Sequence, residues 1–105
     1  MQLGTRTETR RSQRVRLEVD VTIYSREAGV VPGRTVDIGE FGISAVLPIE
    51  LEIGETVKLE FQSALDRPLV EPIVLEAIVR NRNVFRYGFE FAQAGGGREL
   101  LKKLQ

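Results

Sequence analysis

Apolar residues alternate with polar ones along most of the chain, which is the pattern of half-buried β-strands. The clearest run covers residues 16–24, where one face carries Leu17, Val19, Val21 and Ile23. That face is expected to lie on a core while the intervening polar residues face water. Similar patterns predict further strands at residues 34–39, 42–48, 56–61, 73–82 and 86–91.

Turn signals and one helical pattern separate and end these strands. Pro32-Gly33 predicts a turn, with the glycine supplying a positive φ, and the two prolines in residues 63–72 predict a loop or an edge strand. Leu100, Leu101 and Leu104 have helical spacing, so residues 98–105 are expected to form a C-terminal helix. About six strands and one helix favour an all-β fold, a small antiparallel barrel or sandwich.

Composition narrows the classes of function. The 105 residues are enough for one domain, with no sign of a second. The chain has no cysteine and no histidine, which removes the thiolate nucleophile, the commonest general base and the commonest metal ligand. No apolar run has the length of a signal peptide or a membrane span. We therefore expect a soluble cytoplasmic protein that is not an enzyme and holds no metal or cofactor.

Charge is balanced overall but unevenly distributed. The chain has 15 basic and 15 acidic residues, yet five of the basic ones and only one acid, Glu8, lie in residues 1–16. The arginines of this basic arm are Arg6, Arg10, Arg11, Arg14 and Arg16. The rest of the chain is net acidic and would repel a long polyanion such as DNA, RNA or an anionic membrane. A small anionic partner is expected instead.

A second feature is the segment "DIGEFG", which runs from Asp37 to Gly42 at a strand–turn–strand junction. A carboxylate accepts two hydrogen bonds side by side, which matches the adjacent N–H groups on the edge of guanine. Arginine suits phosphate oxygens and the O6/N7 edge of guanine. Structural alternatives remain, because Asp37 can cap a turn, glycines can simply permit a corner, and charged arms are usually just solvated.

These motifs together resemble the PilZ domain family. Its signature is R-x-x-x-R, then a strand, then D/N-x-S-x-x-G, and this chain has Arg10, Arg14 and the segment Asp37–Gly42 in that order. The closing strand "YGFEF" is also similar to that family. The resemblance implies a six-stranded antiparallel β-barrel at residues 16–105, with its short C-terminal α-helix, and a flexible basic arm at residues 1–15.

The resemblance also implies a ligand, cyclic di-GMP. Arg10 and Arg14 would hold its phosphates and guanine, Arg11 would add an accessory contact, Asp37 would accept from a guanine edge, and Gly42 would let the corner approach the ligand. The chain departs from the signature at Gly39, where the family has serine, so one hydroxyl is missing from the predicted site.

Several functions remain open at this stage. The leading hypothesis is a bacterial receptor or adaptor in which cyclic di-GMP orders the arm and switches a surface that a protein partner or a fused effector domain reads. The alternative is a degenerate PilZ domain that binds no cyclic di-GMP and acts as a protein-interaction module. A barrel for single-stranded nucleic acid is disfavoured by the acidic body. Arg80, Arg82 and Arg86 could extend the basic surface, but they are interpreted as solvent-facing residues of strands and a turn.

Overall fold

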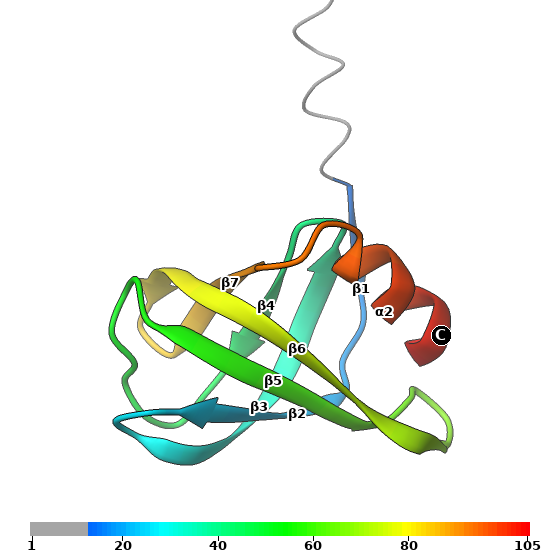
Figure 1. Cartoon of the computed structure of the whole chain (residues 1–105), viewed down its shortest axis with the longest axis horizontal. Coiled ribbons are helices and arrows are strands. Elements are labelled where there is room, and N and C mark those ends of the chain that lie inside the picture. Colours follow the sequence, from blue (N-terminus) through cyan, green and yellow to red (C-terminus); the bar gives the residue numbers. More distant parts are fainter. Residues whose placement is uncertain (1–12) are drawn as a thin grey trace, which may run out of the picture.

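The protein is a closed antiparallel β-barrel with one short helix, as a computed structural model that describes residues 13–105 shows (Figure 1). The strands are β1 (Arg14–Arg16), β2 (Asp20–Ser25), β3 (Gly29–Gly39), β4 (Gly42–Val46), β5 (Thr56–Ser63), β6 (Pro68–Asn83) and β7 (Arg86–Phe91). The helix is α2 (Gly96–Leu104). The predicted all-β barrel with a C-terminal helix is confirmed.

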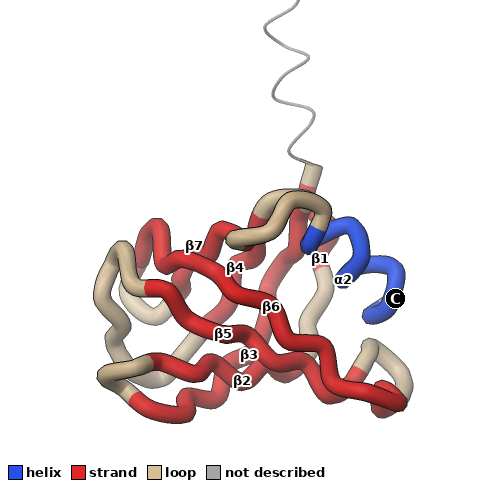
Figure 2. The backbone as a smooth tube through the Cα atoms, viewed as in Figure 1, coloured by secondary structure: helices blue, strands red, loops and turns tan. Residues whose placement is uncertain are grey.

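The order of the strands shows how the barrel closes. The sheet runs β1-β3-β2-β5-β6-β7-β4, and an additional pairing between β3 and β4 closes it. Six strands thus form the barrel, and β1 lies outside it as an extra strand on β3 (Figure 2). Strand β3 therefore pairs with three strands, and it brings the N-terminal segment next to the β3–β4 connection.

The core is formed by the inward faces that the alternation predicted. Leu17, Val19, Val21 and Ile23 are all buried, as are Tyr87, Phe89 and Phe91 of β7. Helix α2 adds two buried leucines, Leu100 and Leu104, to the same core. It starts at Gly96, two residues before the predicted start, and lies at one end of the barrel (Figure 1).

The strand expected at residues 16–24 is divided in two. β1 pairs with residues 37–39 of β3 and β2 pairs with residues 29–34, which leaves Leu17, Glu18 and Val19 opposite only two residues of β3. The hydroxyl of Thr35 lies in this gap, where it donates to the carbonyl of Leu17 and accepts from the amide of Val19 at 2.9 Å. Thr35 is 1% exposed. One buried side chain therefore satisfies the backbone at the division.

The turn predicted at Pro32-Gly33 is wrong. Both residues lie inside β3, and the connection between β2 and β3 ends instead at Gly29, whose φ is +82°. Gly33 is needed for a different reason, because a Cβ there would lie 2.7 Å from Leu47 Cδ2 and 2.9 Å from Ile23 Cδ1. The glycine thus permits close packing of the barrel wall and does not make a turn.

The β5–β6 hairpin also differs from the prediction. β6 begins at Pro68, five residues before the expected strand, and only Ala64–Arg67 remain as a loop. Between the pairs Phe61↔Ile73 and Ser63↔Pro68 the register shifts, so extra residues of β6 bulge out of the ladder. Pro72 lies in this bulge, where proline does not interrupt regular pairing.

Replacing Thr35 with valine tests the role of its hydroxyl. Valine keeps the shape but leaves the Leu17 carbonyl and the Val19 amide without a partner, and each buried unpaired group costs roughly 1–3 kcal/mol. Thr35→Val should therefore lower the free energy of unfolding by about 3 kcal/mol, measured by urea denaturation. Thr22→Val, at a half-buried position of β2, is the matched control and should change it by less than about 0.5 kcal/mol. Equal stability of the two variants would contradict this account.

Candidate functional site

Three charged side chains that are far apart in the sequence meet on the outside of the barrel. Arg14 Nε lies 2.6 Å from Asp37 Oδ1, and Arg86 Nη2 lies 3.2 Å from Asp37 Oδ2. Arg14 comes from β1, Asp37 from β3 and Arg86 from β7. One carboxylate is thus shared by two guanidinium groups, one at each oxygen.

Backbone pairing explains why Asp37 faces outward. The β3–β4 register shifts between Thr35 and Asp37, so Thr35 faces the core while Asp37 pairs with Ser44. The Asp37 side chain is 19% exposed, against 39% for Arg14. Its carboxylate is therefore held at the surface by its own strand, whereas the arginine side chains that reach it are long and more exposed.

The two motif glycines lie where backbone segments approach closely. Gly39 pairs with Arg14, and a Cβ there would lie 3.2 Å from Arg14 Nη1 and 3.3 Å from its Cγ. A Cβ at Gly42 would clash with the carbonyl oxygen of Phe89 on β7. Neither glycine has a positive φ. Both are explained by packing, and their predicted contacts with a ligand stay predictions.

The remaining predicted site residues, Arg10 and Arg11, lie outside the described residues. The expected boundary between an arm at residues 1–15 and a barrel at residues 16–105 also stays a prediction. Of the signature residues, the structure brings together Arg14, Asp37, Gly39 and Gly42. These four lie at or next to residues 39–42, called here the β3–β4 corner.

The N-terminus of α2 lies directly on this corner. A Cβ at Gly97 would clash with the carbonyl oxygen of Gly39 and would lie 2.5 Å from that of Glu40. Arg98, the next residue of α2, places Nη2 2.6 Å from Glu40 Oε2. The helix and the corner are therefore in backbone contact, so the corner is fixed on one side by α2 and on the other by β7.

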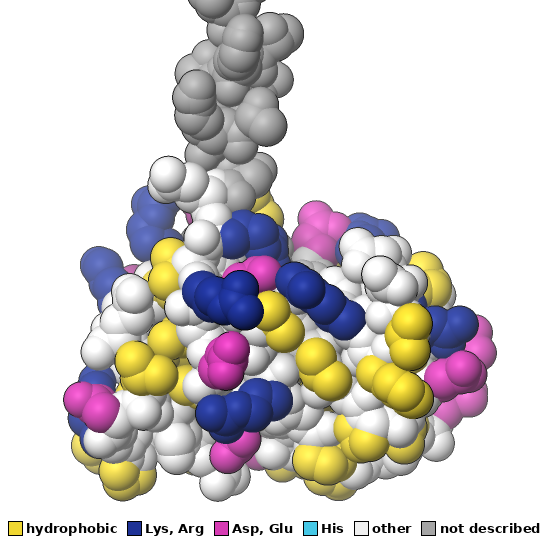
Figure 3. Space-filling view, turned by 180° about the vertical axis from the view of Figure 1, so that it is seen from behind, with side chains coloured by type: hydrophobic (Ala, Val, Ile, Leu, Met, Phe, Trp, Pro, Cys, Tyr) yellow, Lys and Arg dark blue, Asp and Glu magenta, His cyan; other side chains and the backbone are white. Residues whose placement is uncertain are grey.

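A hollow of about 350 Å³ lies beside Arg14 on the outer face of β4, β6 and β7. Its lining includes three small residues, Gly42, Ser44 and Gly88, and the Asn81 side chain lies over Gly88. Around it are Arg14, Phe41, Arg80, Asn81 and Glu90. The volume is within the roughly 300–1,000 Å³ typical of small-molecule sites. On the face shown in Figure 3, basic side chains gather around acidic ones.

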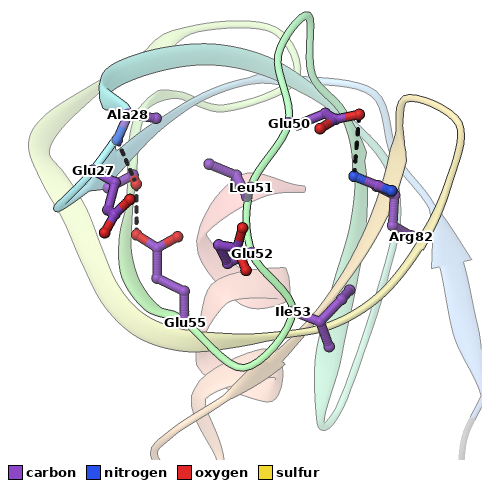
Figure 4. A pocket seen from close by; sticks show the side chains of 9 residues that line it. Glu27, Ala28, Glu50, Leu51, Glu52, Ile53, Glu55 and Arg82 are labelled. Atoms are coloured by element: carbon purple, nitrogen blue, oxygen red, sulfur yellow. Dashed lines mark hydrogen bonds and ion pairs between the residues drawn. The ribbon is translucent and has the colours of Figure 1, made fainter.

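A second hollow, of about 490 Å³, opens at the end of the barrel away from α2 (Figure 4). Four glutamates line it: Glu27, Glu50, Glu52 and Glu55. Its one arginine, Arg82, is paired with Glu50 at 3.4 Å. An anionic ligand would be repelled here, so the hollow beside Arg14 is the better candidate for a phosphate-bearing molecule.

Comparison with known families decides the class of protein. The family model described as PilZ domain matches residues 8–104, which is nearly the whole chain. The chain belongs to the PilZ domain family. The resemblance seen in the sequence is thereby confirmed. PilZ domains in general are ligand-binding or adaptor modules for cyclic di-GMP and are not enzymes.

Two solved structures share the fold of this PilZ domain. The PilZ domain of CeSA from a cellulose-synthesizing bacterium aligns with a TM-score of 0.63 at 21% identity, over 85% of this chain and 89% of that one. The inhibitor of motility MotI/DgrA of Bacillus subtilis aligns with a TM-score of 0.64 at 22% identity. That alignment covers 90% of this chain but 47% of the other, so this PilZ domain spans about half of MotI/DgrA.

No curated protein sequence matches the chain. Among residues 13–105, no helix has the length and apolar character that crossing a membrane requires. Within the same residues, no three acidic side chains converge closely enough to hold a metal ion.

Two features of the site are absent from the sequence-based interpretation. Arg86 was interpreted as a solvent-facing strand residue, but its guanidinium contacts Asp37, 49 residues away in the sequence. The alternation of β7 places Arg86 outside the barrel, yet only barrel closure between β3 and β4 brings it to Asp37. The contact of α2 with the corner is equally non-local, and two consecutive glycines at the helix start are its one sequence signal.

The contact between α2 and the corner can be tested with its two adjacent glycines. Gly97→Ala should lower the free energy of unfolding by about 1–3 kcal/mol, because its methyl group would clash with backbone oxygens of the corner. A Cβ at Gly96 would lie 3.7 Å from its nearest neighbour, so Gly96→Ala should be neutral or stabilise by about 0.5–1 kcal/mol. Thermal unfolding of both variants measures the difference. Equal effects would show that the helix does not depend on this close approach.

Proposed function

We propose that this PilZ domain is a receptor for cyclic di-GMP, which binds on the outer face of the barrel around Asp37. The observation that supports this is the meeting of Arg14 and Arg86 at one carboxylate, beside a hollow of about 350 Å³. The ligand carries two phosphates and two guanines. Guanidinium groups bind phosphate oxygens bidentately, and a carboxylate accepts from the guanine edge.

Binding in this proposal proceeds by exchange of partners. Without ligand, Asp37 neutralises Arg14, and the exposed pair contributes little to stability, about 0–1 kcal/mol. When the dinucleotide arrives, Arg14 turns to a phosphate and the freed oxygen of Asp37 accepts from a guanine. Arg86 stays beside the other carboxylate oxygen and keeps the carboxylate oriented. Arg10 and Arg11 add further positive charge from the preceding segment.

The signal in this proposal passes through the corner. Arg14 pairs with Gly39 in the β1–β3 ladder, and the carbonyl of Gly39 abuts Gly97 at the start of α2. A ligand that binds Arg14 therefore acts next to the residue that contacts the helix N-terminus. A protein partner, or an effector domain fused to this one, would respond to the change in the surface that the bound ligand covers.

A second candidate is a PilZ domain that has lost its ligand and acts as a protein-interaction module. Gly39 in place of the family's serine favours it, because one hydrogen bond to the ligand is missing. Loss of such a bond to a charged group costs roughly 1.5–3 kcal/mol, or about one to two decades of affinity. The two candidates differ in one measurable property, saturable binding of the dinucleotide.

Calorimetric titration with cyclic di-GMP tests the receptor function. We expect saturable binding to the wild type and a loss of about ten- to a hundredfold in affinity for Arg14→Ala, because a charge-assisted contact to phosphate is removed. The control is Arg67→Ala, an arginine paired with Asp66 in the β5–β6 loop, which should bind like the wild type. GMP and GTP should compete poorly.

The outcomes separate the candidates. Absence of heat with the wild type at millimolar ligand would favour the module that binds no ligand. Binding that falls steeply with salt and accepts single-stranded oligonucleotides equally well would instead indicate a nucleic-acid site. Equal losses in Arg14→Ala and Arg67→Ala would show that positive charge in general, and not the site at Asp37, attracts the ligand.

Arg86 is a site residue under this proposal, and its removal has a defined effect. Arg86→Ala should weaken cyclic di-GMP binding about tenfold, because one cation is lost beside a doubly anionic ligand and the Asp37 carboxylate loses its fixed partner. Arg80→Ala, an arginine on β6 paired with Glu90, provides a comparison with a cation at the rim of the same hollow. Titration of the two variants gives the result. A larger loss in Arg80→Ala than in Arg86→Ala would contradict the role assigned to Arg86.

A further inference from the structure

We propose that Ser44 supplies the hydroxyl that is missing at Gly39, and that the hollow beside Arg14 seats one guanine between this hydroxyl and the ring of Phe41. This inference rests on the receptor function proposed above. It adds Ser44 and Phe41 to the residues that recognise guanine. Neither of them is one of the two motif arginines, Asp37 or a motif glycine.

The position of Ser44 follows from the strand register. Ser44 lies opposite Asp37 in the β3–β4 ladder, and the next pair on the other side of Ser44 is with Gly88 of β7. Directly opposed residues of antiparallel strands have Cβ atoms about 4.5–5.5 Å apart on the same face of the sheet. Ser44 is half-buried, and it lines the same hollow as Arg14. Its hydroxyl is therefore presented beside the Asp37 carboxylate.

A serine at residue 39 would be closely packed, whereas Ser44 already carries a hydroxyl across the ladder. The place that a Cβ of residue 39 would occupy has Arg14 at 3.2–3.3 Å and the Gln13 carbonyl oxygen at 3.4 Å. Arg14 thus lies close over Gly39 while its Nε contacts Asp37. Ser44 lies opposite Asp37 in the β3–β4 ladder and lines the hollow.

The hollow has the chemistry of a base-binding site. Gly42, Ser44 and Gly88 are small residues of its lining, and the Asn81 side chain lies over Gly88, so a flat ring that approaches the sheet there must move Asn81. Phe41 lines the hollow from the corner and remains 55% exposed, although a phenylalanine gains by burial. Stacking of a base on an exposed aromatic ring is favourable for any purine. The Ser44 hydroxyl and the Asp37 carboxylate then add hydrogen bonds to the guanine edge, which make the site selective.

Titration of four variants with cyclic di-GMP and cyclic di-AMP tests this. Ser44→Ala should weaken cyclic di-GMP binding about tenfold and leave cyclic di-AMP binding nearly unchanged, because the lost hydrogen bond is specific to guanine. Ser63→Ala, an exposed serine on β5, is the matched control. Phe41→Leu should weaken both ligands, since stacking does not distinguish purines, whereas Phe85→Leu, a similarly exposed phenylalanine, should change neither.

A rescue experiment identifies the role of the hydroxyl. In the double variant Ser44→Ala/Gly39→Ser, cyclic di-GMP affinity should return to within about threefold of the wild type, because the serine at residue 39 requires only a small movement of the flexible Arg14 side chain. Thermal unfolding of each variant checks that the barrel is intact. Failure of the rescue in a folded protein would overturn the assignment, as would unchanged binding in Ser44→Ala.

The outcomes also separate this inference from the receptor function. If the wild type binds and Ser44→Ala binds equally well, the inference fails and the receptor function stands. If the wild type does not bind and the Gly39→Ser single variant does, Ser44 does not replace the missing hydroxyl and the inference fails. If neither binds cyclic di-GMP, the receptor function and the inference fail together.

Discussion

Strand β3 must pair with three other strands, and the rest of the structure depends on how it does so. One of its edges carries β1 and β2, and the other carries β4. Along both edges the register changes near residues 35–37. Thr35 makes this possible, because its buried hydroxyl satisfies backbone groups of Leu17 and Val19. The same irregularity turns Asp37 outward. A constraint of the barrel wall thereby determines where the carboxylate of the site lies.

The charges of the site follow from this geometry. β1 is short, and it carries Arg14 to the carboxylate only because its ladder with β3 is in register with Gly39. β7 brings Arg86 from the other direction once β3 and β4 close the barrel. A net-neutral chain thus has two cations converging on one anion at its surface.

Period-two alternation predicted which residues of the strands face the core, because burial of one face determines it locally. It did not predict the division between β1 and β2 or the early starts of β3 and β6. The turn at Pro32-Gly33 was predicted wrongly because Gly33 is required by Leu47 and Ile23, which approach it only in the folded barrel. Arg86 was missed for the same reason, since its partner lies across a closure that alternation does not reveal. The motif located Asp37 and Arg14, whereas Ser44 and Phe41 required the register and the exposure of the folded chain.

The ion pairs of Asp37 do not prevent a ligand from replacing Arg14 at this carboxylate. An exposed pair is worth about 0–1 kcal/mol, whereas micromolar binding corresponds to about 8 kcal/mol, so releasing Arg14 from Asp37 costs a small part of the binding free energy. One hydrogen bond to a charged group contributes roughly 1.5–3 kcal/mol, which is more than the free energy needed to release Arg14 from Asp37. In the proposed site, the difference between a receptor and a barrel that binds no ligand therefore depends more on the hydroxyl proposed to face the guanine than on the ion pairs of the free site.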